Sequence, residues 1–382
     1  MIIETQEQLD QICAELSQKP YITVDTEFLR DKTFYPILCL IQLSAEDTKA
    51  YAIDPIAFNL DLSPLNDLLH NENVLKVFHA ARQDLEIFYY MNTKVPTPLF
   101  DTQVAAMVCG YGDSIAYHRL VEDVTGKTLS KNAQFTDWSK RPLSDKQLHY
   151  ALDDVIYLRD VYKALDKRLK KQKRDHWLKS EMEILTNPKT YEQPTDEMWK
   201  RVKIRSDKPE VLNILRTLTQ WREETAREKN VPRNRIIKDD ALSDISIYMP
   251  HNIEGLKRIR NLQPDGLKKY GSILLDLIKK AKAQPKSKWP KVKSKEPFPK
   301  HSSPTLEMLK LLLKINASEA DVAPKMIASK DDLEKIATEE QANVPAMAGW
   351  RYEIFGEDAL ALKQGNLTLG LHKGRIQKVI NS

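Results

Sequence analysis

Two acidic residues lie two positions apart in a stretch with the composition of a β-strand, residues 21–28. Because side chains alternate between the two faces of a strand, Asp25 and Glu27 point to the same face. Like charges at this separation repel, and strand interiors disfavour aspartate, so solvent or cations must neutralise the pair. Taken alone, the pair is better explained by two hydrated acids at an exposed strand end.

Two later segments add carboxylates and a tyrosine. The apolar stretch 74–79 runs into a helical pattern, which places Asp84 in the first turns of that helix. Another helix is predicted to open at the capping-box pattern of residues 144–147, and in it Tyr150 and Asp154 are four apart and share a face. An ordinary polar pair on an amphipathic helix is the alternative interpretation.

The elements that must position these residues form an α/β pattern in the first half of the chain. Short connections between the first strands favour antiparallel neighbours, and helical segments follow, which together indicate a mixed sheet with helices. The predicted strands are residues 21–29, 38–44, 49–53 and 74–79, and the predicted helices include residues 82–90 and 145–170. Beyond about Lys208 apolar residues recur at helical spacing, so the second half is predicted to be mainly helical.

Residues 279–300 interrupt the helical half with nine lysines, four prolines and one acid, a composition typical of a linker. A weak repeat lies on either side of it. Val231-Pro232 precedes the pattern of residues 237–245, and Ala323-Pro324 precedes the similar residues 327–336. The repeat favours two related helical units, with chance similarity between two helix starts as the alternative.

Composition narrows the class of protein. A chain of 382 residues with 41% hydrophobic content can form two or three domains, and a net charge of +5 is compatible with a polyanionic partner. Three widely spaced cysteines indicate neither a disulfide framework nor a cysteine-rich zinc site, so a reducing compartment is expected. The N-terminus lacks a signal-peptide pattern, and no apolar run is long enough to span a bilayer. We therefore expect a cytoplasmic protein that does not bind membranes.

These motifs resemble those of a known enzyme class. Asp-x-Glu on the first strand, His79 to Asp84 opening a helix, and Tyr-x-x-x-Asp on a late helix are similar to the three motifs of the DEDDy 3′→5′ exonucleases. The flanking residues narrow the resemblance to the ribonuclease D family, through DTEF (25–28), YP (35–36), IQL (41–43), HA (79–80), DLE (84–86), DTQ (101–103), DW (137–138), RPL (141–143) and YA (150–151). The second half resembles two helicase-and-RNase-D C-terminal (HRDC) domains, through WR (221–222) and VP (231–232) in the first, and residues 333–336 and GWR (349–351) in the second.

The resemblance implies a fold and a domain order. An α/β ribonuclease H-like exonuclease domain is expected at residues 1–205, followed by two all-α HRDC-like domains at 206–284 and 303–382. A Lys/Pro-rich linker is expected between them at 285–302.

The resemblance also implies an activity: metal-dependent removal of nucleoside 5′-monophosphates from the 3′ end of RNA, with tRNA precursors that carry single-stranded 3′ ends as the expected substrates and a monomer as the expected state. Two divalent ions are expected, and all-oxygen ligands suit Mg²⁺ or Mn²⁺. By resemblance Asp25 bridges both ions, Glu27 and Asp154 complete the first site, and Asp84 supports the second. An unperturbed tyrosine has a pKa of about 10, so Tyr150 is expected to orient the attacking water rather than to act as a strong base.

Several neighbours are weaker candidates for substrate contact. Phe28 could stack on the last base, although core packing explains it better. His79 could contact the terminal nucleotide, and a hydrogen-bonded histidine at a strand end explains it at least as well. Lys131 and Arg141 are candidates for phosphate contacts. Asp101 is interpreted as a helix N-cap and Trp138 as a core residue.

Two other functions use the same residues. A proofreading-type DNA exonuclease would carry the same carboxylates, although the helical second half favours ribonuclease D. A non-catalytic nucleic-acid scaffold is disfavoured because all five catalytic positions, Asp25, Glu27, Asp84, Tyr150 and Asp154, are intact.

Overall fold

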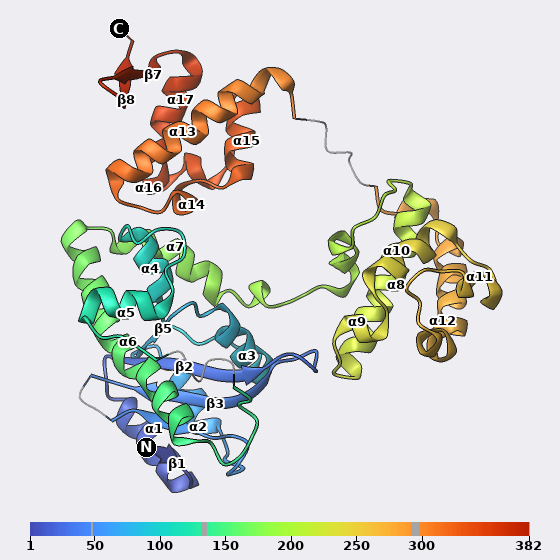
Figure 1. Cartoon of the computed structure of the whole chain (residues 1–382), viewed down its shortest axis with the longest axis horizontal. Helices are drawn as coiled ribbons and strands as arrows, with labels where there is room; N and C mark the ends of the chain where they lie inside the picture. The colour runs from blue at the N-terminus through green and yellow to red at the C-terminus, as the bar shows by residue number, and fades with distance from the viewer. Residues whose placement is uncertain (47–48, 131–135, 292–297, 382) are drawn as a thin grey trace.

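The computed structural model describes residues 1–46, 49–130, 136–291 and 298–381. Figure 1 shows three lobes: an α/β lobe that contains the N-terminus, a helical lobe built around α8 and α12, and a second helical lobe that ends at the C-terminus. Lys131 and residues 292–297 of the predicted linker lie outside the described residues.

Within the described residues, six strands of the α/β lobe form one mixed sheet in the order β1-β4-β3-β2-β5-β6. β2 pairs antiparallel with β3 and parallel with β5, and β3 pairs antiparallel with β4, as the short connections predict. β1 lies parallel to β4, and β6 lies parallel to β5. The strands are β1 (Ile2–Ile3), β2 (Tyr21–Leu29), β3 (Ile37–Ser44), β4 (Tyr51–Ile53), β5 (Leu75–Phe78) and β6 (Leu99–Asp101).

The register of β2 explains why a site can form on it. β5 pairs only with residues 21–23 of β2, whereas β3 accompanies β2 through residue 29, with an irregularity between Glu27 and Phe28. The second half of β2 therefore extends beyond the carboxyl end of its parallel neighbour. Asp25, Glu27, Phe28 and Leu29 are partly exposed there, whereas Thr26 is buried.

Helices cover both faces of this sheet. On one face α1, α2 and α3 pack on Ile22 and Val24, and on the other α6 packs on β2 and β3. The Thr23 hydroxyl donates to the carbonyl of Val155 at 2.8 Å and fastens α6 to the sheet. The helices of this lobe are α1 (Gln6–Leu16), α2 (Ser63–Leu69), α3 (Arg82–Asn92), α4 (Thr102–Val108), α5 (Tyr117–Thr125), α6 (Asp145–Gln172), α7 (Asp175–Thr186) and the 3₁₀ turn η1 (Pro188–Thr190).

The first helical lobe has its own apolar core, centred on α8 and α12. Trp199 and Val202 pack in that core, although the sequence pattern placed them in the exonuclease domain. Its elements are η2 (Thr195–Arg201), α8 (Pro209–Glu228), α9 (Arg233–Ile236), α10 (Asp239–Tyr248), α11 (Ile253–Lys257), α12 (Pro264–Ala283) and η3 (Lys286–Lys288).

The second helical lobe shares a continuous apolar core with α4, α6 and α7 of the α/β lobe. Trp177 of α7 stacks on Trp350 with ring centroids 4.3 Å apart and an interplanar angle of 8°. The elements are η4 (Lys300–Ser302), α13 (Ser303–Ala320), α14 (Pro324–Ile327), α15 (Lys330–Thr338), η5 (Pro345–Met347), α16 (Gly349–Arg351), the π-helical turn η6 (Tyr352–Gly356), α17 (Glu357–Gln364), β7 (Leu367–His372) and β8 (Arg375–Ile380).

The β7–β8 hairpin was not predicted, since the expectation for this half was helical throughout. Both strands are largely exposed and lack the alternation of buried and polar residues that marks a half-buried strand. No helix of the described residues is both long enough and apolar enough to cross a bilayer.

Candidate active site

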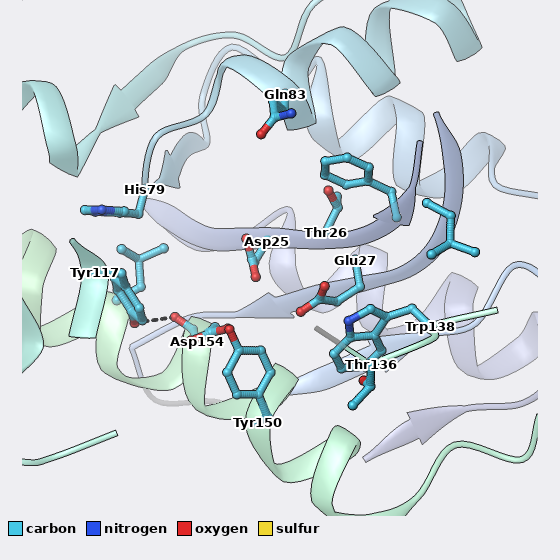
Figure 2. Close-up of a pocket in the computed structure, with 13 residues that line it drawn as sticks. Asp25, Thr26, Glu27, His79, Gln83, Tyr117, Thr136, Trp138, Tyr150 and Asp154 are labelled. Carbon is cyan, nitrogen blue, oxygen red and sulfur yellow. Dashed lines mark hydrogen bonds between the residues drawn. The ribbon is translucent and has the colours of Figure 1, made fainter. Parts of the chain in front are cut away.

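A cavity of about 570 Å³ opens on the accessible half of β2 (Figure 2). Residues from β2, from the starts of α3 and α5, from the segment before α6 and from α6 itself line it. These residues are Asp25, Thr26, Glu27, Phe28, Leu29, His79, Gln83, Tyr117, Thr136, Trp138, Tyr150, Asp154 and Leu158.

Three carboxylates meet in this cavity. One oxygen each of Asp25, Glu27 and Asp154 lies within 4.8 Å of the other two. Figure 2 shows Asp154 on α6 facing the two acids of β2. The alternation along β2 and the position of Asp154 within α6 are therefore sufficient to bring together residues 129 positions apart (154 − 25).

Asp84 lies beside this group but outside it. It is 7% exposed at the start of α3, and its carboxylate accepts a short hydrogen bond from the hydroxyl of Thr26, which points to the opposite face of β2 from Asp25. The negative charge of Asp25 nevertheless acts on it. Asp84 is thus close enough to influence the site electrostatically while its own side chain is held by Thr26.

Burial and mutual repulsion shift the pKa of every acid of the site upward. Desolvation raises the pKa of Asp25 to about 6. Desolvation and the charges of Asp25 and Asp154 raise the pKa of Glu27 to about 10. The pKa values of Asp84 and Asp154 also lie well above their usual range, mainly because of burial. A divalent cation would offset this electrostatic cost, and oxygen-only ligands suit Mg²⁺ or Mn²⁺, so these residues fit a metal site.

Tyr150 lies one helical turn before Asp154 and points into the same cavity (Figure 2). Burial and the charges of Asp154 and Glu27 raise its pKa far above 10, and a hydrogen bond to Asp154 adds to this shift. The hydroxyl therefore keeps its proton at neutral pH and can donate and accept hydrogen bonds. A role in orienting water fits this state, whereas a role as strong base does not.

The turn between β5 and α3 is organised by Asp101. Its carboxylate accepts from the backbone amides of Ala80 and Ala81 at 3.0 and 2.9 Å, and from that of Gln103 at 2.8 Å. Ala80 has φ 57°, in the left-handed region that non-glycine residues rarely adopt. Asp101 is the N-cap of α4, as predicted, and it also stabilises the strained turn that starts the helix bearing Asp84.

The predicted substrate contacts have different outcomes. Phe28 and His79 line the cavity. Nδ1 of His79 lies 3.0 Å from the Thr102 hydroxyl, and burial lowers the pKa of this histidine, so it is neutral. Lys131 is outside the described residues.

Arg141, the other candidate for a phosphate contact, is not among the residues that line the cavity. Its guanidinium donates to the Asp54 carboxylate at 2.8 Å and to the backbone carbonyls of Cys39 and Trp138 at 2.8 and 2.7 Å. Spacing in the sequence could not reveal an ion pair with an acid 87 residues away. Arg141 therefore joins the segment before α6 to β3 and β4 and is not placed to contact a phosphate in the cavity.

Other cavity residues had not been predicted as part of the site. The Tyr117 hydroxyl donates to the backbone carbonyl of Asp154, and its ring lies 5.2 Å from that of His79. Gln83, Thr26 and Thr136 also line the cavity. Thr26 lies within the DTEF motif but had been given no role, whereas Gln83 and Thr136 reach the site through the fold alone. Trp138 is 2% exposed, which confirms the core interpretation, although its indole also borders the cavity.

Comparisons with known proteins agree with this geometry. A family model described as 3′-5′ exonuclease matches residues 1–170, and one described as HRDC domain matches residues 211–278. Ribonuclease D of Nitrobacter hamburgensis is 47% identical over 383 residues and covers 100% of both chains. Ribonuclease D of Bartonella henselae is 46% identical over 95% of this chain and 90% of its own. The crystal structure of Escherichia coli RNase D, described as an exoribonuclease involved in structured RNA processing, superposes with a TM-score of 0.81 at 27% identity, covering 96% of this chain and 98% of that one.

The mixed sheet, the cavity with three carboxylates and the matched exonuclease and HRDC segments define a 3′→5′ exonuclease joined to a helical HRDC domain. The identity of 47% to a ribonuclease D along the full chain shows which family of exonucleases this is. The chain belongs to the ribonuclease D family, whose members are 3′→5′ exoribonucleases.

The raised pKa of Asp25 predicts how stability depends on pH when no metal is bound. The folded protein holds the proton of Asp25 up to about pH 6, whereas the unfolded chain loses it near the ordinary aspartate pKa of 3.8. The contribution of Asp25 to stability is therefore greatest below its pKa in the unfolded chain. It is lost as the pH rises through its pKa in the folded protein, by on the order of 3 kcal/mol. Asp25→Asn should remove this loss. In EDTA, the free energy of unfolding of the variant should therefore rise relative to that of wild type between pH 4 and pH 8.

Urea denaturation of both proteins across that range measures the difference in the free energy of unfolding. Added Mg²⁺ should stabilise the wild type and leave Asp25→Asn almost unchanged. Parallel pH profiles of the two proteins would contradict the assignment.

Proposed function

We propose that this protein hydrolyses RNA from the 3′ end to nucleoside 5′-monophosphates in the cavity on β2, and that its substrates are tRNA precursors with single-stranded 3′ ends. The observation that carries the proposal is the meeting of Asp25, Glu27 and Asp154 within 4.8 Å in a cavity that Tyr150 also lines. The likeness to a structured-RNA exoribonuclease over 96% of the chain supports RNA as the substrate. We further propose a cytoplasmic monomer, in keeping with three cysteines that are all free and buried.

The cofactor of the proposed reaction is a pair of divalent ions, Mg²⁺ or Mn²⁺. Asp25 would contact both, Glu27 and Asp154 would complete the ligands of one, and Asp84 would support the other. Bound there, the ions would lower the pKa of the attacking water and offset charge on the leaving oxygen. Asp84 would have to exchange its hydrogen bond with Thr26, or act through water, to take part.

The remaining cavity residues have proposed roles in placing the substrate. The protonated hydroxyl of Tyr150, beside Asp154, is suited to orient the attacking water. Phe28 offers an aromatic surface for the terminal base, and neutral His79 also lines the cavity. Glu27, with its raised pKa, would give up its proton when a cation binds.

We propose the domain boundaries 1–205, 206–284, 285–302 and 303–382, with the second helical lobe as a second HRDC-like domain. The succession of elements supports this reading. A long helix, a short helix that follows a proline or begins with one, and a helix with two aspartates in its first turn occur as α8, α9 and α10 and again as α13, α14 and α15. Within these boundaries, Trp199 and Val202 at the end of the first domain pack in the apolar core of the second.

A second cavity, of about 800 Å³, offers a place for phosphate contacts on the first helical lobe. Trp199 and Ile204 contribute apolar surface, and the cations are Lys200, Lys203, Arg205 and Lys291. Lys203, Arg205 and Lys291 form no ion pair within the described part of the chain. These cations are therefore free to neutralise a polyanion.

The central test compares matched single-stranded RNA and DNA, with Mg²⁺ and with EDTA, for wild type and Asp25→Asn. We expect hydrolysis of RNA by wild type with Mg²⁺, release of 5′-monophosphates, and loss of hydrolysis in Asp25→Asn with RNA binding nearly unchanged, because the basic surfaces are intact. Preferential hydrolysis of DNA would favour a DNA exonuclease. Binding without hydrolysis by wild type would favour a scaffold.

Tyr150→Phe tests the tyrosine. Loss of one positioned proton-handling group should lower the single-turnover rate by roughly 10². The fold should persist because the ring and its contact with Trp138, at 6.2 Å between centroids, remain. Asp154→Ala should lower the rate further, since it removes a proposed metal ligand. A Tyr150→Phe rate equal to wild type would rule out the role.

Point substitutions test RNA contact by the first helical lobe better than truncation, because deletion of everything after the exonuclease domain would expose the apolar core shared with the second lobe. Lys203→Ala with Arg205→Ala should reduce the slope of log affinity against log salt by about 0.7 for each contact to single-stranded RNA. Lys268→Ala with Lys269→Ala, on α12 and outside the cavity, is the matched control. Equal slopes for both double variants would refute the contact.

A further inference from the structure

The loop between β2 and β3 (residues 30–36) reaches from the α/β lobe to the first helical lobe. The side-chain oxygen of Asn230 accepts hydrogen bonds from the backbone amides of both Phe34 and Tyr35, at 3.1 Å each. Asn230 follows the end of α8 with φ 47°, in the left-handed conformation that asparagine and glycine tolerate. Figure 1 shows the loop extending toward α9.

Two guanidinium groups lie over the ring of Phe34. Arg227 and Arg233 are 5.6 and 5.5 Å from its centroid, within cation–π range. Both arginines pair with Glu223, which is completely buried; Arg233 does so with two hydrogen bonds of 2.9 and 3.0 Å. Glu223 of the helical lobe thus holds both arginines in position to contact the aromatic ring of Phe34.

The same loop is attached to the active site at its other end. It begins directly after Leu29, which lines the catalytic cavity. Arg30 forms a two-contact ion pair with Glu86 on α3, two residues beyond Asp84. The loop therefore connects the catalytic strand and the helix bearing Asp84 with the end of α8.

The two helical lobes are held in different ways. The second lobe shares an extended apolar core with the α/β lobe. Of the described residues before α7, Phe34 is the one that packs against the apolar core of the first lobe. The position of that lobe relative to the cavity consequently depends on few contacts, in which Phe34 and Asn230 are central.

We propose that Phe34, Asn230, Arg227 and Arg233 form a latch that determines substrate specificity by holding the first helical lobe at a fixed distance from the catalytic cavity. An RNA with a folded body can then be gripped by that lobe while its single-stranded 3′ end occupies the cavity. A short oligonucleotide that reaches the cavity without touching the lobe does not depend on the latch. This inference rests on the proposed RNA hydrolysis.

Two substitutions at one position separate the latch from folding. Asn230→Gly removes the acceptor oxygen but suits the left-handed backbone at the end of α8. Asn230→Asp keeps an oxygen at the same place and tolerates the same backbone. Both full-length variants should melt near the wild-type temperature, and any difference in RNA handling then reflects the two hydrogen bonds to the loop.

The substrates are a hairpin RNA with a short single-stranded 3′ tail and a single-stranded oligonucleotide with the same 3′ sequence. For Asn230→Gly we expect kcat/KM on the hairpin to fall by about tenfold, about what loss of a positioned hydrogen-bond pair produces, with the oligonucleotide almost unaffected. Asn230→Asp should behave as wild type on both. Hairpin turnover equal to wild type in Asn230→Gly, or an equal loss on both substrates, would overturn the proposal.

A distance measurement tests the latch without any RNA. The three native cysteines are buried, so cysteines introduced by Glu7→Cys on α1 and Lys269→Cys on α12 can be labelled selectively. The distance distribution between the labels should broaden in Asn230→Gly and stay narrow in Asn230→Asp. Failure of RNA hydrolysis by wild type would count against the proposed function, but the distance distribution would still test the latch. Unchanged distributions in both variants would refute the latch.

Discussion

Repulsion among buried carboxylates is the constraint on which the rest of this structure depends. One carboxylate oxygen each of Asp25, Glu27 and Asp154 lies within 4.8 Å of the other two. Asp84 is close enough for the charge of Asp25 to raise its pKa. Each ionised acid in such a place costs several kcal/mol in lost hydration, before repulsion is added. Without a cation the site destabilises the fold, so the apolar cores on the two faces of the sheet must supply the free energy that keeps it together.

Hydrogen bonds to the backbone near the acids of α6 and α3 hold these acids in place against their mutual repulsion. The carbonyls of Asp154 and Val155, on neighbouring residues of α6, accept from Tyr117 and Thr23, so α6 cannot move away from β2 to relieve the repulsion. Asp101 binds the amides of Ala80 and Ala81 and keeps the turn before α3 in a conformation that would otherwise be unfavourable. The acids are therefore positioned by residues that carry no catalytic motif.

The difference between the acids, which lie in local motifs, and the residues that position them explains which features the sequence could predict. Strand alternation and helical spacing act over a few residues, so the facing pair Asp25 and Glu27 and the capping box at Ser144 follow from local pattern, and the structure has both. Arg141 shows the limit, because its partner Asp54 is adjacent only after β3 and β4 have formed. Tyr117 was missed for the same reason. The β7–β8 hairpin was missed because most of its residues face solvent and leave no periodic pattern.

The three lobes also differ in how strongly they depend on one another. Stacking of Trp177 on Trp350 lies within an apolar core that runs from the α/β lobe into the second helical lobe, so separation of these lobes would expose a large apolar surface to water. The first helical lobe encloses a separate core. Among the described residues, its contacts with the α/β lobe include two hydrogen bonds to the amides of residues 34 and 35 and the packing of the Phe34 ring. Such contacts are worth a few kcal/mol. Movement of the first lobe away from the α/β lobe would therefore leave both apolar cores intact.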